Sequence, residues 1–296
     1  MKLTDLIKIG KETVSALYPE REAGEMVFAY LAETLGIQRY TPVVEPEYDV
    51  APEEARAILK DFDRLAAGEP LQYVTGKAYF YGRAFQVNPH VLIPRPETEL
   101  LCRTALDHIR ESGIQSPKIL DLCTGSGCIA WTMAAECAAD ECGRQNVLVE
   151  AVDISEGALE TAASQSIEES VSVRFHKADV LRMPDPTLFS KGSYDIILSN
   201  PPYVMDSEKA LMRTNVLDHE PHLALFVSDD DPLVFYRAVA HWAVELLKVG
   251  GYGLVEINEA LGEQTAAVFR MAGFSDVRVI KDLSDRDRFV EFTRIK

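Results

Sequence analysis

A short segment, Asn200-Pro201-Pro202-Tyr203, follows an apolar run over 194–199 that is typical of a strand. Its two prolines lack a backbone N–H, so carbonyl oxygens are the only backbone hydrogen-bonding groups that they offer. The Asn200 side-chain oxygen and the Pro201 carbonyl can accept both hydrogens of an NH2 group on a planar amide or nucleobase, and Tyr203 can stack on that group. The segment predicts a site for a planar nitrogen; the other interpretation is a rigid proline turn.

A nitrogen held in this way is placed for attack on an electrophilic methyl group. Such a transfer is an in-line displacement, to which an enzyme contributes orientation and a dry, electron-rich surrounding rather than a strong base. An amide nitrogen is a poor nucleophile because its lone pair is delocalised, and acceptors for its hydrogens offset part of that cost. The segment therefore predicts N-methylation, with catalytic residues Asn200, Pro201, Pro202 and Tyr203.

A glycine turn follows an earlier apolar run, in the segment DLCTGSGCIA at 121–130. Its glycines let a ligand approach the backbone beside a helix N-terminus. The pattern Gly125-x-Gly127-x-x-Ala130 also fits the dinucleotide fingerprint, so NAD is an alternative ligand, and a packing turn without any ligand is another. The cofactor-binding residues expected in this turn are Cys123, Thr124, Gly125, Ser126 and Gly127.

Two acids stand at the ends of the next two predicted strands. Asp153 ends the run 147–153, where a carboxylate can accept hydrogen bonds from the ribose that NAD and S-adenosylmethionine share. Asp179, followed by Val180, comes after 171–176 and can meet an adenine amino group. Either acid alone could equally be a helix cap or a solvated loop residue. In chain order at successive strand ends, however, they predict one crevice.

Asn200 ends the fourth strand and so joins this crevice. An NAD oxidoreductase offers no account of the segment 200–203, whereas a methyl sulfonium beside it does. We therefore expect S-adenosylmethionine as cofactor, S-adenosylhomocysteine as its product, and Asn200 as a further cofactor-binding residue. No metal is expected, because the five cysteines include no CxxC pair and the histidines form no HExxH motif.

The elements that must position these residues change in character along the chain. Residues 1–75 contain helical patterns and no convincing strand, which predicts a small helical bundle. Residues 76–93 are aromatic and β-branched with glycine turn points, which predicts a β-hairpin linker. Residues 94–296 alternate strands and helices and are expected to form the methyltransferase domain.

The expected fold class of this domain is α/β, with a sheet of seven strands, and the resemblance of the segment 200–203 to class I N-methyltransferases implies a class I methyltransferase (Rossmann-like) sheet. Helical patterns separate the first five candidate strands, which indicates right-handed βαβ units, a mostly parallel sheet and helices on both faces. Only turn residues separate the last two, which predicts an antiparallel pair at one edge. The candidate strands are 118–122, 147–153, 171–176, 194–199, 252–257, 277–281 and 289–294.

Composition limits the partners. Of 296 residues, 47 % are hydrophobic and 26 % charged, as in ordinary globular proteins. A net charge of −17 without a Lys/Arg-rich run argues against direct DNA binding; it suits a basic protein, a small molecule or simply solubility. No apolar run approaches the ~20 residues of a membrane span. The charged N-terminus lacks a signal-peptide core, so we expect a cytoplasmic protein without a membrane partner.

Six segments together resemble one family: GEPLQYVTG at 68–76, IPRPETE at 93–99, DLCTGSG at 121–127, AVDIS at 151–155, NPPY at 200–203 and EPHLAL at 220–225. In combination, over essentially the whole chain, they are similar to the release-factor glutamine methyltransferases, the PrmC/HemK family. The resemblance implies methylation of the side-chain nitrogen N5 of the glutamine in the Gly-Gly-Gln motif of class 1 peptide chain release factors. Residues 1–75 are then expected to recognise that substrate.

The chain departs from the family pattern in two places. Cys123 stands where the family usually has glycine, which makes the cofactor turn bulkier. Residues 136–146 form a longer and more polar connection than the family pattern leads us to expect. Neither departure touches the segment 200–203, so the predicted reaction is unchanged.

Two of the family segments have ordinary structural interpretations as well. Pro96 with Glu97 and Glu99 is a good helix start, while the functional interpretation makes this segment, with Arg95, a wall near the cofactor entrance. The loop around His222 either lines the substrate side or only packs.

Other functions share part of this pattern. An adenine-N6 or guanine-N2 nucleic-acid methyltransferase uses the same kind of acceptor site on a flipped base, but the net charge disfavours it. A ribosomal-protein glutamine methyltransferase shares nearly every segment. A non-catalytic regulator that binds S-adenosylmethionine does not need the segment 200–203.

Overall fold

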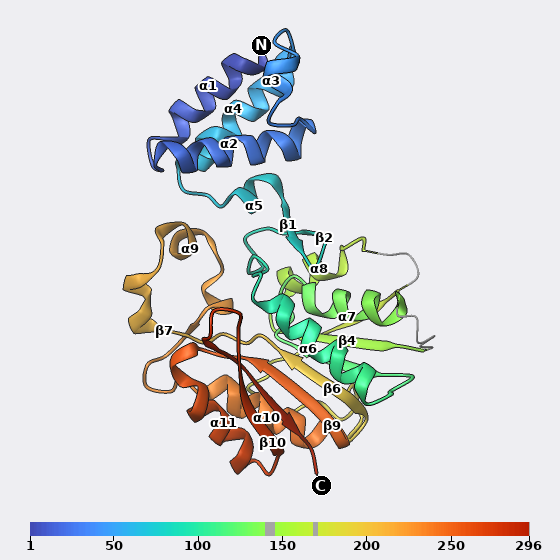
Figure 1. Cartoon of the computed structure of the whole chain (residues 1–296). Coiled ribbons are helices and arrows are strands. Elements are labelled where there is room, and N and C mark those ends of the chain that lie inside the picture. The colour runs from blue at the N-terminus through green and yellow to red at the C-terminus, as the bar shows by residue number, and fades with distance from the viewer. Residues whose placement is uncertain (140–145, 168–170, 296) are drawn as a thin grey trace. The chain divides into compact units, whose positions relative to one another are not determined.

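The computed structural model describes residues 1–139, 146–167 and 171–295, and its backbone falls into two compact units (Figure 1). Unit 1 comprises Met1–Lys77 and Arg213–His219; unit 2 comprises Ala78–Met212 and Glu220–Lys296. Most of the unusual connection expected at 136–146 lies outside the described residues.

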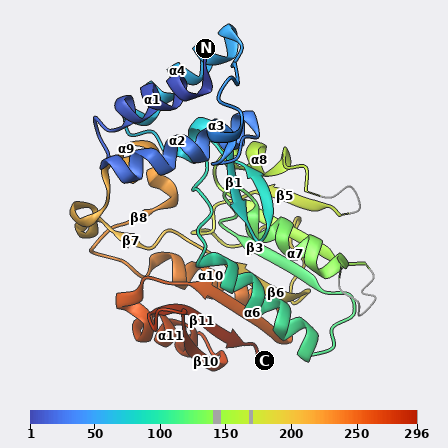
Figure 2. The same cartoon turned by 45° about the horizontal axis from the view of Figure 1, so that its top comes forward.

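Unit 1 is helical, as its sequence pattern predicted (Figure 2). Pro19 precedes α2 (Glu20–Leu35), and Gly36 ends it in the left-handed conformation with φ 65°. The buried core joins the long helices, with the rings of Tyr30 and Phe62 edge to face at 5.5 Å between centroids. The other helices are α1 (Leu3–Val14), α3 (Thr41–Val44), α4 (Pro52–Ala66), α5 (Leu71–Thr75) and α9 (Thr214–His219).

The helix α9 groups with unit 1 although unit 2 residues flank it in the sequence. The Arg213 side chain lies 3.3 Å from the carboxylate of Glu22 on α2, which ties this short stretch to the bundle. Nothing in the sequence pattern indicates this association. The predicted division into 1–75, 76–93 and 94–296, and the recognition role of its first part, remain predictions.

A β-hairpin links the bundle to the sheet region, as predicted. The strands β1 (Lys77–Phe80) and β2 (Arg83–Gln86) pair through a two-residue turn. Both turn residues have positive φ, 50° at Tyr81 and 74° at Gly82, as the type I′ hairpin turn requires. Glycine takes this conformation without steric cost, which explains why glycine occupies position 82.

Unit 2 is built on a seven-stranded sheet in the order β10-β11-β9-β6-β3-β4-β5. The strand β11 runs antiparallel to both its neighbours, and every other pair is parallel, which confirms the predicted sheet and its antiparallel edge. The strands are β3 (Lys118–Leu122), β4 (Leu148–Asp153), β5 (Val173–Lys177), β6 (Tyr194–Ser199), β9 (Leu247–Glu256), β10 (Ser275–Lys281) and β11 (Asp287–Thr293).

Helices cover both faces of the sheet (Figure 1). Alternating residues of a strand point to opposite faces, so Ile119 belongs to one apolar core and Leu120 to the other. The first core includes α6 (Thr98–Glu111) and α7 (Cys128–Ala139). The second includes α10 (Val234–Leu246) and α11 (Gly262–Met271). The helix α8 (Glu156–Ala163) contacts α7 through a hydrogen bond from the Trp131 indole to the Ala162 carbonyl, 2.8 Å.

One expected helix is absent from the described residues. Helical patterns were predicted between each of the first five strands, but the connection from β5 to β6, residues 178–193, is made of turns. Pro184 and Pro186 deprive it of two backbone donors, and Gly192 has φ 57°, so a continuous helix is disfavoured. The prediction was wrong at this connection.

The connection after β6 carries the segment 200–203 and several short elements. The strand β7 (Val204–Met205) pairs in parallel with β8 (Phe226–Val227), which holds both ends of the intervening stretch together. Between and beyond them lie the 3₁₀ turns η1 (Asp206–Leu211), η2 (His222–Ala224) and η3 (Glu259–Leu261). The strand order reverses between β3 and β6, the place where open α/β sheets bind ligands.

Candidate active site

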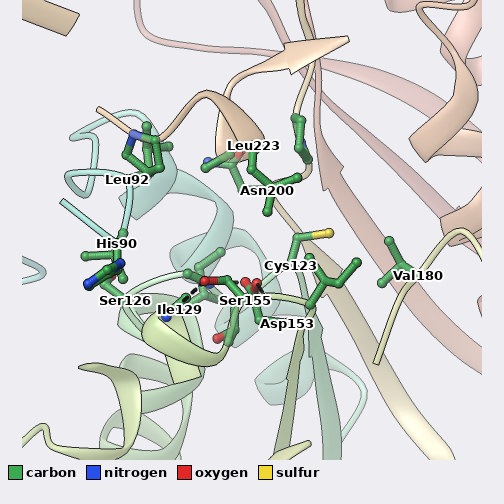
Figure 3. Close-up of a pocket in the computed structure, with 18 of the residues that line it drawn as sticks. His90, Leu92, Cys123, Ser126, Ile129, Asp153, Ser155, Val180, Asn200 and Leu223 are labelled. Atoms are coloured by element: carbon green, nitrogen blue, oxygen red, sulfur yellow. Dashed lines mark hydrogen bonds between the residues drawn. The ribbon is translucent and has the colours of Figure 1, made fainter. Parts of the chain in front are cut away.

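A cavity of about 200 Å³ opens at the carboxyl ends of the parallel strands in unit 2 (Figure 3). Its walls are formed by the turns after β3, β4 and β5 and by the residues that follow β6. The sequence-predicted residues that line it are Cys123, Thr124, Gly125, Ser126, Asp153, Asp179, Val180, Asn200 and Pro202.

The cofactor side of the cavity, formed by the glycine turn and Asp153, is held mainly through backbone donors. The Gly125 N–H donates to Asp153 Oδ2 at 2.9 Å, and the Ser155 N–H donates to Oδ1 at 2.9 Å. Burial raises the pKa of Asp153, although these two hydrogen bonds oppose the shift. A carboxylate can accept about four hydrogen bonds, so Asp153 keeps capacity for a ligand's hydroxyls.

Two positions in the turn adopt the left-handed conformation. Gly125 has φ 55° and open space where a side chain would stand. Cys123 has φ 62°, in the region where a non-glycine residue is strained by roughly 1–2 kcal/mol. Its side chain lines the cavity (Figure 3), and burial raises the pKa of its thiol well above the usual value. The expected bulk at this position is thus accompanied by backbone strain.

A buried carboxylate supports the turn from below. Asp121 is fully buried at the end of β3 and accepts a hydrogen bond from the Thr124 hydroxyl at 2.5 Å. Burial raises its pKa to about 7, and the hydrogen bond from Thr124 lowers it in opposition. The turn is therefore built over a group whose ionised form is costly in the folded protein.

Three sequence-predicted residues do not line the cavity. Gly127 has φ 79°, and a Cβ there would stand 3.0 Å from Ala162 Cβ, so its place is explained by the close packing of α7 and α8. Pro201 is buried. The Tyr203 hydroxyl donates to Glu256 Oε1 at 3.0 Å, and the predicted stacking of Tyr203 on an acceptor remains a prediction.

The acceptor side of the cavity is formed by Asn200 and the side chains behind it. Asn200 Nδ2 donates to Thr98 Oγ1 at 3.2 Å, and this hydroxyl donates to Glu256 Oε2 at 2.7 Å. Glu256 lies at the end of β9 and is 1 % exposed. Burial raises its pKa, whereas the hydroxyls of Thr98 and Tyr203 and the charge of Arg288 lower it.

Asp179 and Val180 line the cavity from the turn after β5. Asp179 Oδ1 accepts from the Leu181 N–H at 2.9 Å, and Arg182 lies 3.5 Å from Oδ2. The carboxylate is thus bound to its own turn, and its predicted contact with an adenine stays a prediction. Val180 is buried and offers an apolar wall.

The segments 93–99 and 220–225 are tied together by one buried acid. Glu220 accepts from Arg95 at 2.6 Å and from the Ile93 N–H at 3.2 Å. Both segments contribute cavity walls, including Arg95, Thr98 and Leu223. The helix-start interpretation also has support, because α6 begins at Thr98.

Glu99 and His222 have local structural roles instead. Glu99 Oε1 accepts from the Tyr81 N–H at 2.8 Å and so holds the hairpin turn. The His222 ring packs edge to face on Phe226, 5.1 Å between centroids, and does not line the cavity.

Sequence reasoning missed several residues that line or support the cavity. Glu256 had a signal, since an acid at the carboxyl end of a fifth strand follows the same logic as Asp153. Thr98 lies inside a quoted segment, but nothing in the sequence points to its partner. His90, Leu92, Ile129, Ala158 and Phe235 also line the cavity and carry no recognisable pattern.

Comparison with known proteins identifies the family. The methyltransferase small domain matches residues 98–223, and the PrmC N-terminal domain matches residues 6–76. A release factor glutamine methyltransferase of Bacteroides thetaiotaomicron is 38 % identical over 284 residues, covering 96 % of this chain and 97 % of the relative. The chain belongs to the release factor glutamine methyltransferase family. Another member, from Streptococcus pneumoniae, is 35 % identical and covers 98 % of both chains.

The family and the α/β fold support S-adenosylmethionine as the cofactor, and the predicted resemblance is confirmed. A solved structure of a release factor-specific protein-(glutamine-N5) methyltransferase from Alicyclobacillus acidocaldarius is 24 % identical, with a TM-score of 0.41 over 72 % of this chain and all of the other. Among the described residues, no helix is long and apolar enough to cross a membrane. The same residues contain no group of three or more metal-ligating side chains.

Proposed function

We propose that this enzyme transfers a methyl group from S-adenosylmethionine to the side-chain amide nitrogen N5 of the glutamine in the Gly-Gly-Gln motif of class 1 peptide chain release factors. The observation that carries the proposal is the position of Asn200 on the wall of a strand-end cavity, beside the glycine turn and Asp153. Membership of the family, with relatives of that name matching nearly the whole chain, supports the same substrate.

The residues of the cofactor side fit this cofactor. Asp153 is fixed by two backbone donors and retains acceptor capacity for the ribose hydroxyls. The open space at Gly125 admits a ligand close to the backbone, and Ile154 and Val180 offer apolar contact for a base. When bound, S-adenosylmethionine supplies an electrophilic methyl group on a positively charged sulfur. The product, S-adenosylhomocysteine, is expected to occupy the same residues.

The chain's own residues bind and orient the acceptor amide. Asn200 Oδ1 accepts one hydrogen of the target NH2 group; Pro201 does not line the cavity, so the predicted contact of its carbonyl with the other hydrogen stays a prediction. The contact with Asn200 strengthens as the nitrogen gains positive charge, so it lowers the barrier rather than only improving binding. One of the two protons on the nitrogen passes to water after methylation, because an N-protonated amide is strongly acidic, and no strong base is therefore required at this wall.

Unit 1 is proposed to recognise the body of the release factor, while the cavity of unit 2 engages the Gly-Gly-Gln loop. Unit 1 carries none of the cavity residues, and a family domain of its own covers most of it. The net charge of −17 suits a basic partner better than a nucleic acid. We propose a cytoplasmic location, where translation supplies the substrate.

The test is incubation of the protein with methyl-labelled cofactor and, in parallel, purified release factor, ribosomes or nucleic acid. Mass mapping should place the label on the glutamine of the Gly-Gly-Gln loop. Label on a ribosomal protein or a nucleobase, with none on release factor, would replace the proposed substrate. Cofactor binding without transfer to any acceptor would indicate a regulator.

A further inference from the structure

The orientation of the Asn200 amide is decisive for the proposed reaction. The oxygen and the NH2 group of an asparagine have nearly the same shape, so sterics alone do not select between the two orientations. If Asn200 presented its NH2 group to the target NH2 group, two donors would face each other. Something behind Asn200 must therefore select the orientation that points the oxygen at the acceptor.

A buried chain of hydrogen bonds lies behind Asn200. Its Nδ2 donates to Thr98 Oγ1 at 3.2 Å, and Thr98 Oγ1 donates to Glu256 Oε2 at 2.7 Å. The Tyr203 hydroxyl donates to the other carboxylate oxygen at 3.0 Å. Thr98 and Glu256 are 2 % and 1 % exposed, so water does not compete for these groups.

Which group donates in each of these hydrogen bonds follows from counting their hydrogens. An ionised Glu256 can only accept, so the single hydroxyl hydrogen of Thr98 must point at it. The face of the hydroxyl toward Asn200 then holds only lone pairs, which can pair with the NH2 group and repel the oxygen. Asn200 Oδ1 accepts no hydrogen bond from any residue in the described parts of the chain, and Asn200 lines the cavity (Figure 3).

We propose that Thr98 and Glu256 are positioning residues that select the catalytic orientation of the Asn200 amide. The proposal rests on the proposed methyl transfer to an amide nitrogen. The charge on Glu256 sets the direction of the Thr98 hydroxyl, and that hydroxyl sets which end of Asn200 faces the acceptor. Donation from Nδ2 also polarises the amide, which makes its oxygen a better acceptor.

These hydrogen bonds should make the rate of methyl transfer depend on pH. A protonated Glu256 can donate to Thr98, whose own hydrogen is then free to turn toward Asn200 and favour the opposite orientation. Burial raises the pKa of Glu256. The rate should be full above that pKa and fall as the pH falls through it.

Charged and titratable groups reach Glu256 from every element packed around it. Arg288 on β11 favours the ionised form, and Glu97 before α6 opposes it. The remaining neighbours are Tyr203 after β6, Tyr236 on α10 and Cys128 on α7, and burial raises the pKa of each further above neutrality.

The experiment measures single-turnover methyl transfer, S-adenosylhomocysteine affinity and thermal stability for three variants of the full chain. Thr98→Val keeps the shape and removes the hydroxyl, Glu256→Gln keeps the shape and removes the charge, and Thr98→Ser keeps the hydroxyl. We expect a roughly 5- to 30-fold lower rate for Thr98→Val and Glu256→Gln, the range for loss of one oriented hydrogen bond. Thr98→Ser should stay within about 3-fold of wild type, and cofactor-product affinity should change little in all three.

Two matched controls lie in the same domain. Thr265→Val removes another fully buried threonine hydroxyl, whose oxygen has no hydrogen-bond partner in the described structure. Glu291→Gln alters another buried glutamate, on β11, that accepts from the Tyr252 hydroxyl at 2.8 Å. Neither residue lines the cavity, so both controls should keep the wild-type rate.

Two readouts separate positioning from a structural role. The fall in rate at acidic pH should weaken in Glu256→Gln and persist in Glu291→Gln. The side-chain NH2 signal of Asn200 in a nitrogen-15 spectrum, assigned by its absence in Asn200→Ala, should lose its protection from exchange in Thr98→Val and keep it in Thr98→Ser.

The proposal is overturned if folded Glu256→Gln transfers methyl at the wild-type rate with an unchanged pH profile, or if the controls lose as much as the variants. If Thr98→Val melts early, the rate and the pH profile of Glu256→Gln, compared with those of Glu291→Gln, carry the test. Failure of the proposed function looks different, because wild-type protein would then label another acceptor or none. The spectrum tests the orientation of Asn200 in either case.

Discussion

The two sides of the cavity are built from contacts of very different range. On the cofactor side, the Thr124 hydroxyl donates to Asp121 three residues away, and the Gly125 N–H donates to Asp153 across 28 residues. One turn and the neighbouring strand end thus supply the whole arrangement. Backbone donors, which every sequence carries, provide much of it.

On the acceptor side, side chains brought together by the fold do the positioning. Asn200 donates to Thr98 across 102 residues, and Thr98 donates to Glu256 across 158. These residues come from α6, the end of β6 and the end of β9. A side-chain network of this kind exists only once the sheet is assembled, whereas the glycine turn is already specified by a short stretch of chain.

The sides also differ in strain. Both sides hold a buried carboxyl whose pKa burial raises, Asp121 and Glu256, but Asp121 Oδ1 has no hydrogen-bond partner in the described structure, and the glycine turn also holds a non-glycine residue with positive φ. On the acceptor side, each oxygen of Glu256 accepts a hydrogen bond. The comparison therefore predicts that variants on the acceptor side act on the rate, while variants on the cofactor side act on affinity and stability.

The largest effect is expected for Asn200→Ala. It removes an acceptor contact that strengthens as charge develops on the target nitrogen, so the single-turnover rate should fall about 10²–10³-fold. The assay is transfer to a Gly-Gly-Gln release factor, with a thermal melt to confirm folding. Asn200→Asp should also be impaired, because it loses the donor to Thr98. A folded Asn200→Ala protein with the wild-type rate would contradict the proposed role of Asn200 as an acceptor for the target nitrogen.

Asp121 should make stability depend on pH. Its folded-state pKa of about 7 lies above the ordinary 3.8, so the folded protein binds the proton more tightly than the unfolded chain does. The contribution of the protonated form to stability is therefore complete below about pH 4 and is lost as the pH rises toward 7. The corresponding loss of unfolding free energy is about a few kcal/mol at most.

The variant Asp121→Asn should remove this dependence. Chemical denaturation at pH 5 and pH 8 should show a smaller loss of unfolding free energy for the variant than for wild type. Parallel losses in the two proteins would mean that the strain assigned to the cofactor side is not carried by Asp121.

Asp153→Ala should weaken binding of S-adenosylmethionine and of its product by roughly 1.5–3 kcal/mol, because charge-assisted hydrogen bonds to the ribose are lost. Calorimetry with the product measures the affinity without turnover. At saturating cofactor the rate should recover most of its wild-type value, in contrast to Asn200→Ala. A rate that stays low at saturation would break the division between the two sides.

The smallest effect is expected for Cys123→Gly. The substitution relieves the left-handed strain but adds freedom to the unfolded chain, so the unfolding free energy should change by no more than about 1 kcal/mol. Removal of the side chain also widens the cavity wall, and product affinity should rise a few-fold at most. Cys123→Ala is the matched variant, because it shortens the side chain and keeps the strain. If Cys123→Gly and Cys123→Ala bind the product equally tightly, the effect comes from the bulk of the side chain rather than from backbone conformation.

Local patterns were enough to predict much of the molecule. Apolar runs that end at Asp153 and directly before Asn200, and helices bounded by Pro19 and Gly36, are short-range signals, and the structure has the corresponding strands and helices. The antiparallel edge followed from the short turn between its two strands. The expected helix between β5 and β6 does not form, because Pro184 and Pro186 remove two backbone donors that a continuous helix needs.

By itself, the sequence determined the α/β class, the family and the set of strand-end residues, because these depend on spacing along the chain. Only the tertiary structure decided that Arg213–His219 group with the helical unit, that Gly127 serves packing rather than the cavity, and that Thr98 and Glu256 stand behind Asn200. The physical reason is range. A hydrogen bond between side chains more than a hundred residues apart leaves no periodic trace in the sequence, since its geometry is set by the packing of the elements that carry them.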